Sequence, residues 1–160
     1  MGLPRYSLVL AVLLIIALGC IAVPVSAADH TLNPGDSIQE NITAAGIGDT
    51  IILNRGTYTE HDIIIDKTII IQANTSAGGN PANTIIDAEY AGRIFDNSGG
   101  HALAIDNLTL QNGMAHDGGA IYSRGGTVTI TDSIISDCSA TGYPPTMGGA
   151  IYSRGGTITI

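Results

Sequence analysis

The sequence predicts an all-β fold, a parallel β-helix (solenoid) in which short strands stack in successive windings, for three reasons. Residues 118–130 recur 30 residues later as residues 148–160, with Val128 replaced by Ile158 as the single change. Each copy contains short apolar and polar alternations separated by glycine pairs, which are typical of strands and turns. The chain is also rich in Gly, Ile, Thr, Asn and Asp, and the repeat lacks the amphipathic stretches that helical repeats need.

The first 27 residues have the three-part layout of a secretory signal. Arg5 supplies a positive charge, residues 8–23 are uninterruptedly apolar, and Val25-Ser26-Ala27 provides the −3 to −1 positions of a cleavage site. We expect residues 1–27 to be a signal peptide cleaved after Ala27, and the protein to be secreted or displayed on the cell surface. Two alternatives stay open: the apolar run is kept as a membrane anchor, or Cys20 is lipidated.

Cleavage would also set the charge of the mature chain. It removes Arg5 alone among the charged side chains, which leaves five basic and fourteen acidic ones and a net charge of −9. Such a charge repels phosphate backbones, so we exclude nucleic acid as a partner. Cys138 would be the only remaining thiol, so the fold is expected to hold without an intramolecular disulfide.

Residues 28–48 are predicted to form an N-terminal cap that contains one short helix. Asp36 or Ser37 can cap the start of this helix, and one apolar face follows from its spacing. We expect that face to cover the edge of the first winding, because an open sheet edge invites aggregation. The residues on the face are Ile38, Ile42 and Ala45.

Residues 49–160 are predicted to form the windings, about four or five in number. In the repeat, the strand candidates are residues 120–123, 127–131 and 134–136. Each winding has a strand, a polar corner rich in Asp, Asn or Ser, and then a second strand. The strand period of two predicts which side chains point inward. This inward set is Leu103, Ile105, Leu108, Leu110, Val128, Ile130 and Ile134.

Five motifs follow one another along the chain: Gly48-Asp49-Thr50-Ile51-Ile52-Leu53, Gly56-Thr57-Tyr58, Thr84-Ile85-Ile86-Asp87, Leu108-Thr109-Leu110-Gln111-Asn112-Gly113 and Gly118-Gly119-Ala120-Ile121-Tyr122. The series resembles right-handed parallel β-helix repeat proteins of cell surfaces, including methanogen surface proteins and the repeats of polymorphic outer-membrane proteins. The resemblance covers nearly the whole mature chain from about Asp36, and it implies a right-handed β-helix at the cell surface. It implies no single activity, because the family includes adhesins, scaffolds and polysaccharide-active enzymes.

Two pairs of side chains occupy equivalent positions in the repeat, Tyr122 with Tyr152 and Arg124 with Arg154. Stacked windings would place like on like, which favours aromatic packing but makes the arginines repel one another unless an acid such as Asp117 intervenes. The tyrosines either form a packing ladder or a stripe that binds carbohydrate. These residues favour an exported, non-catalytic scaffold or adhesin-type protein that contacts extracellular polysaccharide or a cell-envelope component.

The alternative function is a polysaccharide lyase or glycoside hydrolase of the β-helix type. It would use Asp87, Glu89 and Arg93, since an extended segment places the two carboxylates on one face about 7 Å apart, compatible with an inverting glycosidase. The simpler interpretation is a solvated loop between strands. No second acid-rich motif builds a substrate cleft, so no catalytic residue is assigned.

No cofactor or metal site is assigned. Weak calcium binding is conceivable at Asp62 with Asp66, or at Asp132 with Asp137, but the ligand spacing of known calcium loops is absent. Three glycosylation sequons begin at Asn41, Asn74 and Asn107, and Asn74 is favoured because a polar stretch surrounds it.

The second copy of the repeat stops at Ile160, the equivalent of Ile130, after which the first copy continues with a corner and a third strand. We therefore expect the C-terminal winding to be truncated, and membrane attachment to come only from the N-terminal signal or from an anchor beyond this sequence. Residues 28–160 expressed alone should self-associate through the open winding. Light scattering at tens of micromolar tests this expectation, and a monomer would contradict it.

Overall fold

A computed structural model describes residues 26–142 and 147–160 of the chain. The predicted signal segment, residues 1–27, lies outside the described residues except for Ser26 and Ala27. Within the described residues, no helix is long and apolar enough to cross a membrane.

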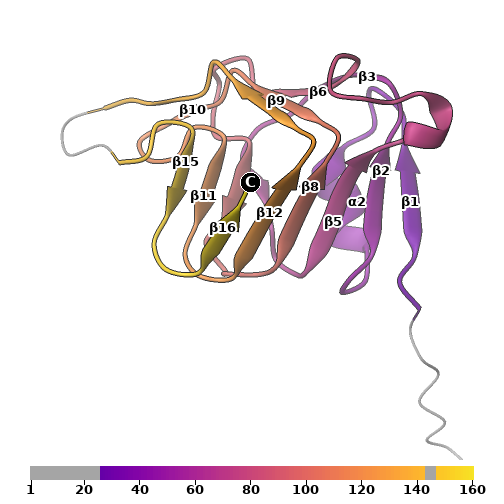
Figure 1. Cartoon of the computed structure of the whole chain (residues 1–160), viewed down its shortest axis with the longest axis horizontal. Helices are drawn as coiled ribbons and strands as arrows, with labels where there is room; N and C mark the ends of the chain where they lie inside the picture. Colours follow the sequence, from indigo (N-terminus) through magenta and orange to yellow (C-terminus); the bar gives the residue numbers. More distant parts are fainter. Residues whose placement is uncertain (1–25, 143–146) are drawn as a thin grey trace, which may run out of the picture.

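Three parallel sheets carry the structure (Figure 1). Sheet A contains β1 (Asp29–Leu32), β2 (Thr50–Leu53), β5 (Ile69–Ala73), β8 (Leu103–Asp106), β12 (Thr127–Thr131) and β16 (Thr157–Thr159) in that spatial order. Sheet B contains β3 (Gly56–Thr59), β6 (Thr84–Asp87), β9 (Thr109–Gln111) and β13 (Ile134–Ser136). Sheet C contains β4 (Ile63–Ile64), β7 (Phe95–Asn97), β11 (Ile121–Ser123) and β15 (Ile151–Ser153). A short pair, β10 (Met114–Ala115) with β14 (Ser139–Ala140), and a 3₁₀ turn, η1 (Thr75–Ala77), complete the elements around the windings.

From β2 onward, the chain visits sheets A, B and C in the same order again and again, and we call one such passage a winding. Every pair of neighbouring strands is parallel, so the all-β prediction with parallel pairing is confirmed. The offset between paired residues of sheet A varies from 20 (Ile51 with Ile71) to 34 (Ile71 with Ile105). The strands keep their register, and the connections between them differ in length.

The strands predicted in the repeat match β11, β12 and β13 closely. The two copies lie directly on one another, since Tyr122 pairs with Tyr152 and Val128 pairs with Ile158. The repeat is therefore one winding of the structure stacked on its own duplicate.

The inward side chains of all three sheets form one hydrophobic core. Six of the seven residues predicted to point inward are buried; these are Leu103, Ile105, Leu108, Leu110, Val128 and Ile130. The prediction for Ile134 is wrong, because this side chain is 51% exposed and Ile135 packs inward against the core instead. Ile134 pairs with Thr109 and Ile135 with the buried Leu110, so Ser133 and not Ile134 stands at the position of the buried Leu108.

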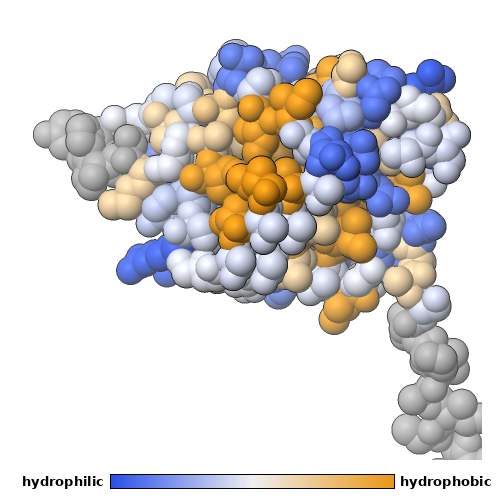
Figure 2. All heavy atoms as spheres, viewed as in Figure 1, coloured by the Kyte–Doolittle hydropathy of each residue, from blue (hydrophilic) through white to orange (hydrophobic). Residues whose placement is uncertain are grey.

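Hydrophobic residues also reach the surface at the end of sheet A. Figure 2 shows a hydrophobic region at the centre of the view, where the chain ends beside β16 in Figure 1. Ile160 is 86% exposed there. Self-association through this end stays a prediction.

The polar corners adopt the left-handed backbone conformation that Asn and Asp tolerate better than other side chains. Asn107 and Asp132 have φ angles of 57° and 45° at equivalent corners between sheets A and B. Asn112 and Asp137, with φ angles of 56° and 52°, repeat the pattern after sheet B. The predicted polar corners are confirmed, and the positive φ explains why Asn and Asp stand at these positions.

The N-terminal helix α2 (Ile38–Ala44) forms as predicted, with Ser37 as its N-cap and its apolar face buried. The Glu60 carboxylate accepts hydrogen bonds from the Ser37 hydroxyl (2.9 Å) and from two backbone N–H groups of the first turn. Lys67 Nζ donates to three carbonyl groups at the other end of the helix. Charges of both signs thus complement the helix dipole, because the anion lies at the N-terminus and the cation at the C-terminus.

Strand β1 was not expected from the sequence, and a buried carboxylate explains how it is held. Asp49, 4% exposed, accepts hydrogen bonds from Ala28 N (2.8 Å), His30 Nε2 (2.9 Å) and Gly46 N (2.7 Å). These bonds, led by the one from Ala28 N, lower the pKa of Asp49 from 3.8 to about 2. One ionised side chain therefore ties β1 and the end of the cap to sheet A.

Replacing Asp49 by Asn should destabilise the protein at neutral pH by several degrees in Tm, because the charged acceptor is lost. A carboxylate whose folded pKa is lowered contributes stability above its ordinary pKa and loses it as the pH falls. The Tm difference between wild type and Asp49→Asn should therefore narrow as the pH falls from 3.8 to about 2. Thermal melts followed by circular dichroism between pH 7 and pH 2 provide the measurement.

Asp66→Asn is the matched control, since the Asp66 side chain is 50% exposed and lies 3.7 Å from Lys67. Its Tm should follow that of the wild type at both pH values. An Asp49→Asn protein as stable as the wild type at pH 7 would contradict the anchoring role.

Candidate functional site on the outer face of sheet C

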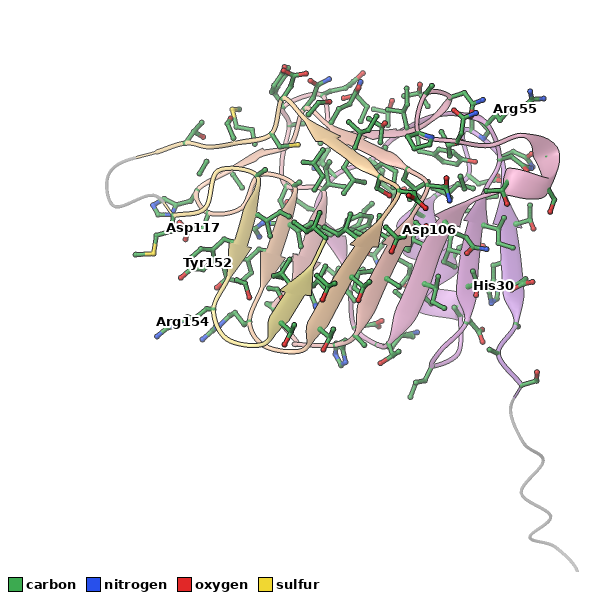
Figure 3. The ribbon with its side chains drawn as sticks, in the orientation of Figure 1. His30, Arg55, Asp106, Asp117, Tyr152 and Arg154 are labelled. Atoms are coloured by element: carbon green, nitrogen blue, oxygen red, sulfur yellow. The ribbon has the colours of Figure 1, made fainter. Side chains whose placement is uncertain are left out.

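The strands of sheet C alternate between core and solvent. In β11, Ile121 and Ser123 are buried and Tyr122 is partly exposed. The register then sets Asp96, Tyr122 and Tyr152 side by side in one outward column. In Figure 3, Tyr152 and Arg154 both project away from the body on the same side of the molecule.

The two tyrosines of this column stack on one another. Their ring centroids are 5.4 Å apart, with an interplanar angle of 27°. The guanidinium carbon of Arg93 lies 4.6 Å from the centroid of the Tyr122 ring. Because Arg93 pairs with Asp96 on β7 and Tyr152 lies on β15, the two neighbours flank Tyr122 from opposite sides. Both faces of the Tyr122 ring are thus covered.

All three nitrogen atoms of the Arg93 guanidinium group donate hydrogen bonds. Nη1 donates to Asp96 Oδ2 (2.9 Å), Nε to Gly118 O (3.1 Å) and Nη2 to Asp117 O (2.7 Å). The carbonyl acceptors belong to the turn before β11, so Arg93 joins two windings. With the cation–π contact to Tyr122, the group acts as a clamp on the column.

The turn that follows each strand has the same construction in both copies of the repeat. Ser123 Oγ donates to Gly125 O (2.8 Å), and Ser153 Oγ donates to Gly155 O (2.7 Å). At Gly126, φ is 70°, and a Cβ atom would lie 2.4 Å from Gly100 O. Only glycine fits this close approach, which lies two residues after Arg124.

Arg124 and Arg154 both lie exposed at these turns. The backbone ladder continues to them, since Arg124 N donates to Asn97 O (3.2 Å) and Arg154 N to Ser123 O (2.8 Å). Their backbones are therefore one strand spacing, about 4.8 Å, apart. Within residues 26–142 and 147–160, neither guanidinium group forms an ion pair.

Asp117, expected as a possible partner between the two arginines, is engaged elsewhere. Its carboxylate accepts a hydrogen bond from Met147 N (2.8 Å) and lies 3.2 Å from His116 Nδ1. Burial raises the pKa of Asp117, but the hydrogen bonds from His116 and Met147 outweigh it and leave the pKa below the ordinary value. The positive charges of Arg124 and Arg154 are left without this counter-ion.

The three residues of the alternative catalytic set do not converge. Glu89 has a φ of 50°, so the chain is not extended after β6, and Glu89 N donates to Asp87 Oδ1 (2.8 Å). Asp87 also accepts hydrogen bonds from Gln111 Nε2 (2.7 Å) and Asn112 Nδ2 (2.9 Å). Burial raises the pKa of Asp87, but these three bonds outweigh it and lower the pKa below its ordinary value. Arg93 belongs to the tyrosine column instead.

Among the described residues, no three His, Cys, Asp or Glu side chains gather into a group that could hold a metal ion. Of the acids considered for calcium, Asp62 lies 2.9 Å from His61, and Asp132 and Asp137 occupy two different corners of one winding. Cys138 packs against the core, and burial raises the pKa of its thiol.

The amide nitrogens of all three sequon asparagines donate hydrogen bonds within the protein. Asn41 Nδ2 donates to Ser37 O (2.8 Å), and Asn107 Nδ2 to Asp106 Oδ2 (3.2 Å). Asn74 Nδ2 donates to Asn54 Oδ1 (2.7 Å), which belongs to a ladder of stacked amides along one corner. A glycan at Asn74 would have to be accommodated beside this ladder.

No protein-family model, curated protein or solved structure matches this chain. The sequence identified the equivalent tyrosine and arginine positions, but it assigned Arg93 to the alternative catalytic set with Asp87 and Glu89. Phe95, Asp96 and Asn97 alternate in the same way as the residues of β11 with which they pair. This similarity could have placed Arg93 beside sheet C.

Replacing Arg93 by Lys should destabilise the protein by about 1–3 kcal/mol, because lysine cannot reproduce the fork of donors to one carboxylate and two carbonyl groups. Urea unfolding followed by circular dichroism measures this loss. Arg55→Lys, at an exposed loop position, is the control and should leave the unfolding midpoint unchanged. Equal midpoints for Arg93→Lys and Arg55→Lys would contradict the clamp.

Proposed function

We propose that this chain is an exported cell-surface scaffold of the right-handed parallel β-helix type. In this role it is an adhesin-like protein that contacts an extracellular polysaccharide or another cell-envelope component without catalysing a reaction. The observation that carries the proposal is the repeated outer face of sheet C, where Tyr122 and Tyr152 stack and Arg124 and Arg154 follow them. A surface that repeats from winding to winding suits a ligand that also repeats.

The order of the strands supports the solenoid. Each winding passes through sheets A, B and C and returns to a parallel position beside its own beginning. Crossovers between parallel strands of one sheet are right-handed in nearly all proteins, which favours the right-handed form. Stability then accumulates from winding to winding, as it does in other repeat proteins.

The sequence of residues 1–27 and the net charge of −9 after their removal support export. The acidic surface also disfavours nucleic acid, whose phosphates it would repel.

The contacts of Asp87 argue against its use as a general acid. A general acid must carry a proton near the working pH, whereas Asp87 is held ionised by three hydrogen bonds and has a lowered pKa. Glu89 donates to this carboxylate through its backbone N–H and not through its side chain, and Arg93 donates to Asp96, Gly118 and Asp117 instead.

A glycan-array screen combined with reducing-sugar and unsaturated-product assays tests the proposal on the chain. We expect binding without turnover, and we expect Tyr152→Ala to weaken the binding because it removes the outer ring of the stack. Asp106→Asn, which changes an acid of sheet A, is the control and should bind like the wild type. Enzymatic turnover that is abolished by Asp87→Asn would overturn the scaffold function. Binding that Tyr152→Ala leaves unchanged would show that the ligand does not contact the outer face of sheet C.

A further inference from the structure

We infer that the outer face of sheet C binds an acidic polysaccharide of the polyuronate class. Arg124 and Arg154 would contact carboxylates of successive sugars, beside the hydroxyl groups of Tyr122 and Tyr152. The inference rests on the proposed function and specifies the ligand of that same face.

The basic side chains of the mature chain are few and unevenly distributed. Of the five that follow residue 27, Arg93, Arg124 and Arg154 lie on sheet C or at its edge. Lys67 is used to cap helix α2, and Arg55 lies on the opposite side of the molecule in Figure 3. Asp96 pairs with Arg93, and the Asp117 carboxylate at the turn before β11 contacts His116 and Met147, so Arg124 and Arg154 carry the charges of this face that form no ion pair within the described residues. Figure 2 shows a strongly hydrophilic projection at the position where Figure 3 labels Arg154.

The groups that this face offers to a ligand are mainly hydrogen-bond donors. Guanidinium groups donate only, and a phenol hydroxyl group can donate as well as accept. Tyr122 cannot serve as a platform for a neutral sugar ring, because Arg93 and Tyr152 cover its two faces. An array of donors with two unpaired positive charges is complementary to an anion.

The spacing of the two arginines selects the kind of anion. Their backbones are one strand spacing apart, about 4.8 Å, along the direction in which the windings stack. A polyuronate carries one carboxylate on each sugar ring, and the length of a pyranose unit in an extended chain is close to this spacing. Successive rings are turned about the chain axis, so the two long arginine side chains would spread along the stack to reach carboxylates on one side of the polysaccharide. Each arginine can bind a carboxylate with two parallel hydrogen bonds.

The arginines are not needed to build the winding. Arg124 lies two residues after Tyr122, which is in register with Asp96 and Ile64 of the earlier windings. Two residues after these positions, the earlier windings carry Ser98 and Asp66. Two like charges on neighbouring strands repel, so the arginine pair costs stability where aspartate or serine would not. A bound polyanion removes this repulsion. At physiological salt, charges beyond about 8 Å are largely screened, so the local pair outweighs the distant acidic surface.

Biolayer interferometry of the chain with immobilised polygalacturonate tests the inference, and fully methyl-esterified polygalacturonate is the neutral probe of the same backbone. We expect binding to polygalacturonate that weakens as salt increases and is lost with the ester. The double variant Arg124→Gln/Arg154→Gln should bind about tenfold more weakly, as expected for two exposed charge contacts. Arg55→Gln removes one positive charge away from the face and should bind like the wild type.

The remaining outcomes separate this inference from the proposed function. Equal binding of the ester and the acid, or wild-type binding by the double variant, would overturn the uronate site and leave a surface for neutral glycans. Equal binding to single-stranded DNA of similar charge would also overturn it, because attraction to any polyanion would then suffice. If neither polygalacturonate nor any glycan of an array binds, the polyuronate site and polysaccharide recognition by this face both fail.

Discussion

The structure depends on parallel strands stacking in register, so that each inward side chain rests on its equivalent in the next winding. In sheet A, one buried column consists of Ile51, Ile71, Ile105 and Ile130, all at most 4% exposed. A slip by one residue would turn every one of these isoleucines to the solvent, because side chains alternate along a strand. The register is therefore fixed by the core, and the positions of the outward side chains follow from it.

Windings of unequal length can share one register because the corners are fixed while the connections vary. Left-handed residues such as Asn107 and Asp132 turn the chain at equivalent points, and glycine does so where backbone atoms of two windings approach. Polar side chains then tie the corners together across windings, as Asn54 does in donating to Asn33 and accepting from Asn74. The outward column from Asp96 to Tyr152 is continuous for the same reason, although the chain between its members differs in length.

The sequence predicted those features that repeat or that local chemistry determines. The duplicated segment, the helix with its Ser37 cap and the polar corners were all visible as patterns, and the structure contains each of them. The prediction failed where the outcome depends on contacts between windings of unequal length. Ile134 was placed inward because Ser133 was counted as part of the corner, which made the corner one residue too long. Strand β1 depends on the Asp49 carboxylate, which no periodicity reveals. The role of Arg93 likewise follows from a register with β11 that the sequence between them does not specify.

A duplicated winding in fixed register must produce ladders of identical side chains on its outer face, and these ladders differ in their physical effect. The tyrosine ladder stabilises the stack, since the rings are 5.4 Å apart and Arg93 covers the inner one. The arginine ladder has the opposite effect, because Arg124 and Arg154 repel and form no ion pair within the described residues. Packing thus explains the tyrosines but not the arginines. Earlier windings fold with Asp66 and Ser98 at the comparable positions, so the fold itself does not require arginine there. The polyanion that we propose as the ligand would supply the interaction that the described residues do not provide.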